Sequence, residues 1–210
     1  MNVQTVRELR PGPVGPLEVA VDAPAADVAP RGLAVLCHPH PLHGGTLDNK
    51  VVQTLARAVV HAGWQCVRLN YRGVGRSAGA WDGGPGETDD AQCIVTHFRQ
   101  AGQPLLLAGF SFGGHVAACL AQRLAEQGIP ARRLILIGPA TANFPVPPVA
   151  PDTLVVHGEV DEVVPLQATL DWARPQALPV VVVPGVGHFF HGQLPLLKSL
   201  VGRWLAPDLS

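Results

Sequence analysis

Residues 105–120 read LLLAGFSFGGHVAACL, and this stretch decides the fold. Its first part, 105–109, is a short apolar run that predicts a buried strand. Across 112–127, apolar residues recur at helical spacing, which predicts a helix that ends at Gly128. The five residues between them, GFSFG at 109–113, have the pattern G-x-S-x-G. The strand, the tight turn and the helix therefore follow one another without a break.

The central residue of this turn, Ser111, is a candidate nucleophile. In so tight a turn, side chains at Gly109 and Gly113 would collide with neighbouring backbone. The turn holds Ser111 in a strained conformation with its hydroxyl at the amino end of the helix, where partial positive charge favours an alkoxide. A Gly/Ser turn that merely links a strand to a helix is the structural alternative. Because both flanks match, the sequence favours a nucleophile elbow.

Short apolar runs alternate with longer segments of helical periodicity along the rest of the chain. Apolar residues on consecutive positions are typical of strands in a parallel sheet that is covered on both faces. Strands are expected at 33–37, 66–71, 105–109, 134–137, 153–157 and 179–183, and helices at 48–62, 90–101, 112–127 and from Pro195 onward. This alternation predicts an α/β fold with a mostly parallel central sheet and helices on both faces.

Two segments depart from the regular alternation. Residues 17–21 predict an antiparallel strand near the sheet edge. Residues 138–152 join two expected parallel strands but contain five prolines, so we expect no regular helix there. The chain shows no internal repeat and no linker, and its 210 residues fit one core. Residues 1–210 are therefore predicted to form a single domain.

A serine nucleophile needs a base and a group that orients the base. The strand expected at 153–157 is followed by GEVD, which places Asp161 in a loop at its carboxyl end. The strand expected at 179–183 is followed by PGVGH, which places His188 in a second such loop. Parallel strands put these loops on one edge of the sheet, so Ser111, Asp161 and His188 are expected to converge.

Other residues compete for these two roles. The alternative acids are Glu159, Glu162 and Asp152. The alternative base is His191, which is expected in the first turn of the last helix. Gly185 and Gly187 allow a turn that projects His188 instead, so His188 is favoured. His157 has no partner at a telling spacing and is expected to be an ordinary strand residue.

The order Ser, Asp, His along the chain is that of the α/β-hydrolase fold. From its first central strand to its C-terminus the chain resembles α/β-hydrolases, and within them small lidless bacterial serine hydrolases related to dienelactone hydrolases and Xaa-Pro dipeptidyl-peptidase-like domains. The closer likeness rests on HPHPLHGGT at 38–46, NYRGVGRS at 70–77 and HGEVDEVVP at 157–165. The resemblance implies that Asp161 is the acid, that 70–77 is a structural loop, and that no cap domain is present.

The segment HPHPLHGG follows the first central strand, from which α/β-hydrolases take the second amide of the oxyanion hole. A tetrahedral intermediate needs two such donors. One is expected from Phe112, the residue after the nucleophile. Pro39 and Pro41 have no N–H, which leaves the His40 amide as the second. The alternative is a metal site, but no cysteine or carboxylate follows at a suitable spacing, so neither metal nor cofactor is expected. The side-chain roles of His38, His43 and His115 stay open.

The composition excludes several classes of partner. Fifteen basic and sixteen acidic residues give a formal charge of −1 without a block of like charge, so neither nucleic acid nor a membrane is expected. The four cysteines fit no disulfide framework, and the start of the chain lacks the apolar run of a signal peptide. Reduced thiols without a leader predict a cytoplasmic protein.

These residues predict a metal-free serine hydrolase that works through an acyl-enzyme. Small carboxylic esters are the first expected substrates, which makes the protein a carboxylesterase. Thioesters come second, and peptides of the Xaa-Pro type come third. A hydrolase-fold protein that binds small molecules or partners without turnover is the alternative from another class. The physiological substrate and the choice between monomer and homodimer stay open.

Overall fold

The computed structural model describes residues 5–24 and 29–206. Its strands are β1 (Thr5–Gly12), β2 (Gly15–Asp22), β3 (Leu33–Cys37), β4 (Gln65–Leu69), β5 (Leu105–Phe110), β6 (Arg133–Ile137), β7 (Leu154–Gly158) and β8 (Val180–Val183). Within the described residues they form one sheet in the order β1-β2-β4-β3-β5-β6-β7-β8.

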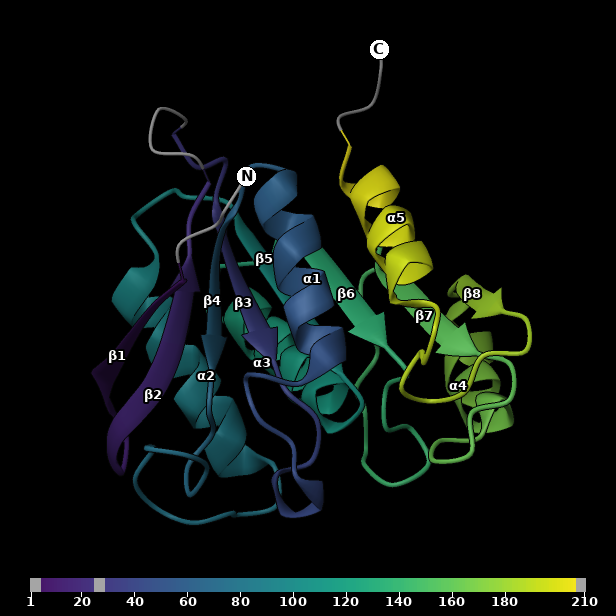
Figure 1. Cartoon of the computed structure of the whole chain (residues 1–210), viewed down its shortest axis with the longest axis horizontal. Coiled ribbons are helices and arrows are strands. Elements are labelled where there is room, and N and C mark those ends of the chain that lie inside the picture. Colours follow the sequence, from purple (N-terminus) through teal and green to yellow (C-terminus); the bar gives the residue numbers. More distant parts are fainter. Residues whose placement is uncertain (1–4, 25–28, 207–210) are drawn as a thin grey trace.

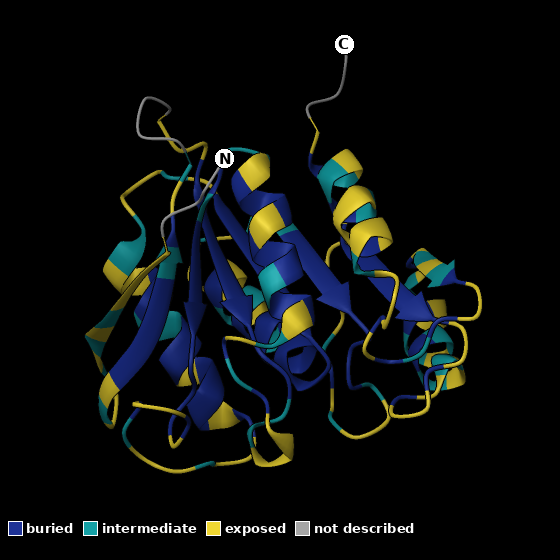
Figure 2. Cartoon of the chain, viewed as in Figure 1, coloured by how far each residue is buried: buried dark blue, intermediate teal, exposed yellow. Residues whose placement is uncertain are grey.

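The strands β4, β3, β5, β6, β7 and β8 are neighbours in this order, and each of these six pairs in parallel with the next. All six were expected from apolar runs, and the mostly parallel sheet is confirmed. In Figure 1 the arrows of β3, β6 and β7 point to the same edge of the sheet, and the loops that follow them gather there. Figure 2 shows these strands mostly buried, as their largely apolar sequences require.

The antiparallel side of the sheet is wider than expected. Residues 17–21 lie in β2, which pairs antiparallel with β4. β2 is second from the edge rather than at the edge, because β1 also pairs with it along its whole length. The sequence of β1, TVRELRPG, is polar, and its residues are exposed or half-buried. A strand that buries so little apolar surface has no clear apolar pattern, and it was not predicted.

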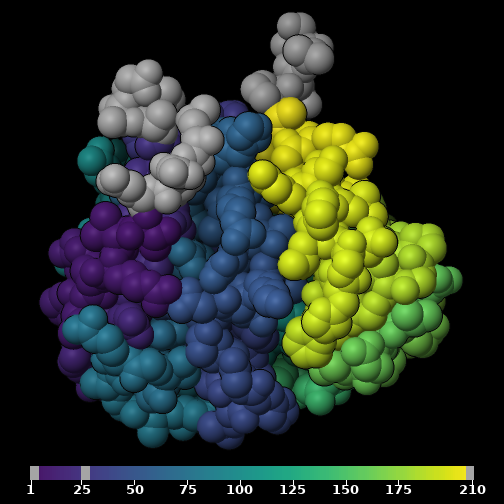
Figure 3. All heavy atoms as spheres, in the orientation of Figure 1, coloured from purple at the N-terminus to yellow at the C-terminus, as the bar shows by residue number. Residues whose placement is uncertain are grey.

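Helices cover both faces of the sheet, which confirms the second part of the fold prediction. They are α1 (Lys50–His61), α2 (Pro85–Phe98), α3 (Phe112–Glu126), α4 (Leu166–Ala173) and α5 (Leu194–Leu205). Residues of α1 and α5 share one core cluster, and residues of α2 and α3 share the other. Figure 1 shows α1 and α5 in front of the sheet, and Figure 3 shows them side by side on the surface.

Helix α2 begins earlier than the 90–101 predicted from the sequence. Its first residue is Pro85, which fits a first helical turn because proline has no N–H to satisfy. Glu87 accepts a hydrogen bond from the Gly84 amide at 2.7 Å, which closes the amino end of the helix. Asp90 then pairs with Arg72 at 2.9 Å, and this ion pair holds the 70–77 loop in place. This contact agrees with the structural reading of that loop, which stays a prediction.

Residues 138–152 connect β6 to β7 without a regular helix, as their prolines predicted. Nothing in the described ranges, 5–24 and 29–206, forms a cap domain over the carboxyl edge of the sheet. None of the described helices is long and apolar enough to cross a membrane.

Candidate active site

Ser111 lies in the turn between β5 and α3 with φ 57° and ψ −120°. A left-handed φ is strained for a residue that carries a side chain. A Cβ on Gly109 would lie 1.9 Å from the Gly113 carbonyl oxygen, and one on Gly113 would lie 2.2 Å from the Cys37 carbonyl oxygen. The Ser111 amide donates to the Ile137 oxygen at 2.9 Å. Any side chain at either glycine would therefore displace the serine.

Asp161 and His188 form a buried hydrogen-bonded pair. His188 Nδ1 lies 2.7 Å from Asp161 Oδ2. The other carboxylate oxygen accepts hydrogen bonds from the amides of Val163 at 2.9 Å and Val164 at 2.7 Å. Burial raises the pKa of Asp161, but the hydrogen bonds, led by that from His188, outweigh it and hold the pKa below its usual value. Asp161 is therefore ionised at neutral pH and fixes the orientation of the imidazole.

The His188 ring lies close to the elbow. Its centroid is 4.8 Å from that of Phe110, the residue before Ser111. A Cβ on Gly138 would lie 3.4 Å from two atoms of the His188 ring, and Gly138 directly follows Ile137, which binds the Ser111 amide. The structure thus brings the three residues predicted from the sequence to one place.

The Ser111 hydroxyl is not committed to its own helix, since it makes no capping hydrogen bond to α3. Among the described residues, the His188 side chain hydrogen-bonds to Asp161 and not to Ser111. Contacts between a nucleophile and its base are often long without substrate and tighten when substrate binds.

Two of the alternative acids bind the backbone of the loop that carries His188. Glu159 Oε2 accepts a hydrogen bond from the Gly185 amide at 2.8 Å. Glu162 Oε2 accepts one from the His188 amide at 3.3 Å. Neither carboxylate contacts the imidazole, whereas Asp161 does. Glu159 and Glu162 therefore hold the loop, and the ring is oriented by Asp161.

The remaining alternatives lie elsewhere. Asp152 pairs with Arg133, the first residue of β6, at 3.1 Å, so it lies toward the other end of the strands. His191 was expected in the first turn of the last helix, and this is wrong. Helix α5 begins at Leu194, and His191 lies in the preceding turn, just before Gly192 with φ 74°.

The loop after β3 packs directly against the elbow, because Gly113 approaches the Cys37 backbone so closely. Phe112 is the first residue of α3, and His40 precedes the short 3₁₀ helix Pro41–His43. The amides of both residues donate no hydrogen bond to any other described residue. The amides at the start of a helix are the ones that the helix leaves unpaired.

The histidine side chains of this loop make local contacts. His38 is fully buried; its Nδ1 lies 2.6 Å from the following carbonyl oxygen, and its Nε2 accepts from the Tyr71 amide at 3.2 Å. Burial lowers the pKa of His38 to about 3, which keeps the ring neutral. His40 Nδ1 accepts from the Leu42 amide at 3.2 Å, and its ring stacks on His43 at 4.4 Å. No group of three or more histidine, cysteine or carboxylate side chains in the described part of the chain is placed to hold a metal ion.

Four rings form an aromatic cluster beside the elbow: His40, Trp81, Phe112 and Phe144. They come from the segments that follow β3, β4, β5 and β6. Successive ring centroids lie 4.4 Å, 4.9 Å and 4.9 Å apart. His115 is buried and stacks on Phe144 at 5.2 Å, which gives it a packing role. Trp81 and Phe144 were missed in the sequence, because only the fold brings their loops together.

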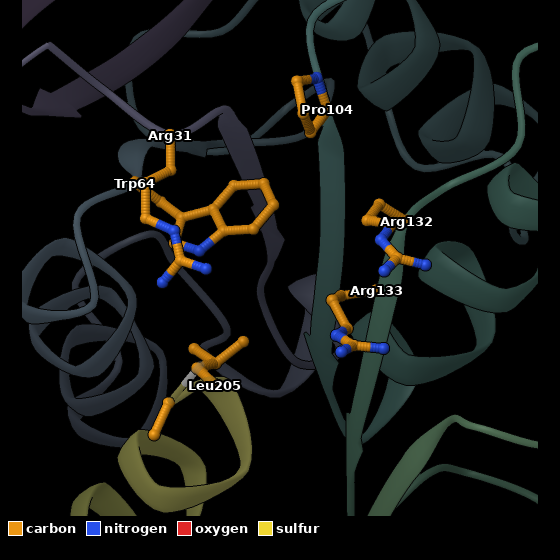
Figure 4. Close-up of a pocket in the computed structure, with 7 residues that line it drawn as sticks. Arg31, Trp64, Pro104, Arg132, Arg133 and Leu205 are labelled. Carbon is orange, nitrogen blue, oxygen red and sulfur yellow. The ribbon is translucent and has the colours of Figure 1, made fainter. Parts of the chain in front are cut away.

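A cavity of about 250 Å³ lies at the opposite, amino edge of the sheet (Figure 4). Its lining is Arg31, Trp64, Pro104, Arg132, Arg133, Leu205 and Ala206. Pro104 immediately precedes β5, and Arg133 begins β6, so the cavity opens where the parallel strands start. It is not part of the site around Ser111.

The fold and the elbow define a class of protein, the α/β serine hydrolases without a cap. A family model described as "Serine aminopeptidase, S33" matches residues 29–151. The crystal structure of an α/β serine hydrolase without a lid from Xanthomonas campestris is 38% identical, with a TM-score of 0.86 over 98% of this chain and 95% of that one. An α/β serine hydrolase homologue from Coxiella burnetii is also 38% identical, with a TM-score of 0.82 over 98% and 100% of the two chains. This chain belongs to the α/β-hydrolase superfamily.

Curated sequences agree with this assignment. An uncharacterized protein of Rickettsia prowazekii is 38% identical over 118 residues, which are 55% of this chain and 49% of that protein. An AB hydrolase superfamily protein of Bacillus subtilis is 29% identical over 105 residues, which are 49% of this chain and 38% of that protein. The matches thus span half or less of the length of these curated relatives.

Proposed function

We propose that this protein hydrolyses small carboxylic esters through an acyl-enzyme on Ser111. The observation that carries the proposal is the buried Asp161–His188 pair at 2.7 Å beside the strained elbow. A buried carboxylate that orients an imidazole next to a serine hydroxyl is the arrangement that converts serine into a nucleophile.

In the first step, His188 Nε2 takes the hydroxyl proton of Ser111 while the serine oxygen attacks the ester carbonyl carbon. The carbonyl oxygen becomes negatively charged, and the amides of His40 and Phe112 stabilise that charge. When the intermediate collapses, the bond to the alcohol oxygen breaks and His188 gives this oxygen its proton. The alcohol leaves, and the acyl group stays on Ser111.

In the second step, a water molecule attacks the acyl-enzyme through the same series of proton transfers. His188 takes a proton from the water molecule as its oxygen attacks the acyl carbon, and the same two amides stabilise the charge. Collapse of this intermediate breaks the bond to Ser111, which recovers its proton from His188. Asp161 keeps the imidazole in the required orientation and stabilises its protonated form throughout. The acid product then leaves.

The surroundings of the site favour small, uncharged esters. No cap forms over the carboxyl edge within the described residues. The half-buried rings of Trp81 and Phe144 offer flat apolar surface beside the two amides. Such a surface suits the apolar part of an ester.

A peptidase is the second candidate, because the matching family model is described as a serine aminopeptidase. An aminopeptidase must pair the positive charge on the free amino group of its substrate with a carboxylate. Glu159 and Glu162 are the carboxylates that follow β7 beside Asp161, and each already accepts a backbone hydrogen bond. This favours esters over peptides. Thioesters use the same chemistry and remain the nearest alternative within it.

A matched panel of substrates tests the proposed function. Initial rates are measured with 4-nitrophenyl acetate, an acetyl thioester, and 4-nitroanilides of alanine and of an Xaa-Pro dipeptide. We expect the oxygen ester to have the highest kcat/KM and the anilides the lowest. Faster cleavage of an anilide would assign a peptidase instead. Specific ligand binding without turnover of any of the four would assign a non-catalytic binding protein.

The role of the His40 backbone gives a separate prediction. His40→Ala keeps the amide, so we expect kcat to fall less than about tenfold. His40→Pro removes the N–H, and loss of one oxyanion donor typically costs about 10²–10³ in kcat. The measurement is kcat of both variants on 4-nitrophenyl acetate.

Circular dichroism of the His40→Pro variant shows whether the loop change leaves the fold intact. Both variants are also assayed with and without EDTA. Equal losses for alanine and proline, together with inactivation of the wild type by EDTA, would assign the histidine loop to a metal instead of the oxyanion hole.

A further inference from the structure

His157 contacts the same carboxylate that binds His188. It is the fourth residue of β7, four positions before Asp161, and its side chain is fully buried. Its Nε2 lies 2.9 Å from the Val164 carbonyl oxygen and 3.3 Å from Asp161 Oδ2. Two imidazoles therefore approach one carboxylate oxygen. The proposed mechanism uses only that of His188.

The partners of His157 fix its protonation. A carbonyl oxygen can only accept, so Nε2 carries the proton that is donated to Val164. Burial is the largest effect on this ring and lowers the pKa of His157. Nδ1 is buried without a hydrogen-bond partner among the described residues. A second proton there would be unpaired in a dry site, so His157 stays neutral with its hydrogen on Nε2.

This hydrogen lies beside the shell of donors around Asp161. Oδ1 accepts from the amides of Val163 and Val164, and Oδ2 accepts from His188 at 2.7 Å. The Nε2 hydrogen of His157 is donated to the Val164 oxygen, and the same nitrogen lies 3.3 Å from Oδ2. Donors on both oxygens oppose rotation of the Asp161 carboxylate about its Cβ–Cγ bond.

We propose that His157 is a positioning residue: its neutral Nε2–H binds the carbonyl of Val164, whose amide binds Asp161, and Nε2 lies against the carboxylate oxygen that orients His188. Its effect on turnover rests on the function proposed above, whereas the contact itself can be tested without substrate. In the sequence His157 begins the HGEVD segment, and its spacing to Asp161 gave no signal of the contact.

The sign of its electrostatic effect follows from the charges around it. The titratable groups that act on His157 are Asp161 and His188. Glu159 and Glu162 bind the backbone of the His188 loop instead. A neutral donor withdraws negative charge from Oδ2. Its removal leaves more charge facing His188, which favours the protonated imidazole and moves deprotonation of the base to higher pH.

Two amide side chains of different reach give a matched test. In His157→Gln the side-chain nitrogen reaches about as far as Nε2 and can still donate to the Val164 oxygen beside Asp161. In His157→Asn the amide is one carbon shorter and falls short. Both substitutions bury the same polar group, so a general loss of core stability affects both. His157→Leu, which has no donor at all, is the third variant.

Two measurements are made on each variant. NMR titration follows protonation of His188 in the resting protein, and kcat/KM for 4-nitrophenyl acetate is recorded from about pH 5 to 9. We expect His157→Asn and His157→Leu to move both the titration and the acid limb to higher pH, and to lower kcat about three- to tenfold, the worth of one neutral hydrogen bond. His157→Gln is expected to stay close to the wild type in both.

Equal behaviour of the Gln and Asn variants, with an unmoved His188 titration, would overturn the proposal and leave His157 a packing residue. This holds even if His157→Leu fails to fold. The NMR titration could shift as expected while neither the wild type nor any variant hydrolyses esters. In that case the positioning role stands and the proposed function fails.

Discussion

Ser111→Ala is expected to lower kcat for 4-nitrophenyl acetate by about 10⁴-fold or more, because it removes the atom that forms the acyl-enzyme. The Ser111 hydroxyl makes no capping hydrogen bond, and alanine meets the same strained φ of 57° as serine. Folding therefore loses little, and the thermal midpoint is expected to stay at the wild-type value.

Ser199→Ala is the matched control. Ser199 lies on the exposed side of α5, far along the chain from the elbow. The substitution makes the same chemical change there, the loss of one serine hydroxyl. We expect this variant to keep the wild-type kcat. If Ser111→Ala keeps more than about a tenth of wild-type kcat, the acyl group is carried elsewhere and Ser111 is only a turn residue.

The second large effect is expected from Asp161→Asn. This change keeps the shape of the side chain but removes the charge that stabilises the imidazolium of His188. The amide nitrogen also has to face a donor, either His188 or the amides of Val163 and Val164. Loss of the orienting carboxylate costs about 10⁴ in kcat in a serine triad.

Asp161→Asn is also expected to lower stability with a defined pH dependence. The folded protein holds the pKa of Asp161 below its usual value. A depressed carboxyl pKa stabilises the fold above the unfolded pKa, and this contribution is lost as pH falls through the folded pKa. The difference in free energy of unfolding between wild type and variant should therefore be largest near neutral pH and shrink in acid.

Asp152→Asn is the control for this pair of measurements. It makes the same chemical change at another candidate acid, an exposed residue paired with Arg133. We expect its kcat to match the wild type, since surface ion pairs contribute little. A loss for Asp152→Asn as large as that for Asp161→Asn would mean that the change of net charge, and not the contact with His188, sets the rate.

The parallel part of the fold was predictable because its signals are local. Strands such as β3 and β5 are apolar at every position, and α1 and α3 carry regular apolar stripes that end near glycine. Strand β1 escaped prediction because it is polar and half-exposed and is held mainly by hydrogen bonds to β2. Its partner, rather than its own sequence, makes it a strand.

The candidate site was predictable only where a residue follows a recognisable strand. Asp161 and His188 could be placed on one edge because β7 and β8 had already been located. The contact of His157 with Asp161 depends on how the chain turns back after β7, which the alternation of apolar residues does not encode. The packing of Trp81 beside His40 depends in the same way on two loops that meet only in the folded chain.

The central claim is that Ser111 becomes acylated, and covalent labelling tests it most directly. Wild-type protein is treated with a fluorophosphonate probe, and the modified peptide is located by mass spectrometry. We predict one adduct per chain, on the peptide that contains Ser111, and no adduct in Ser111→Ala or after denaturation of the wild type before treatment. An adduct on another residue, or equal labelling of Ser111→Ala, would contradict the assignment of Ser111 as the nucleophile.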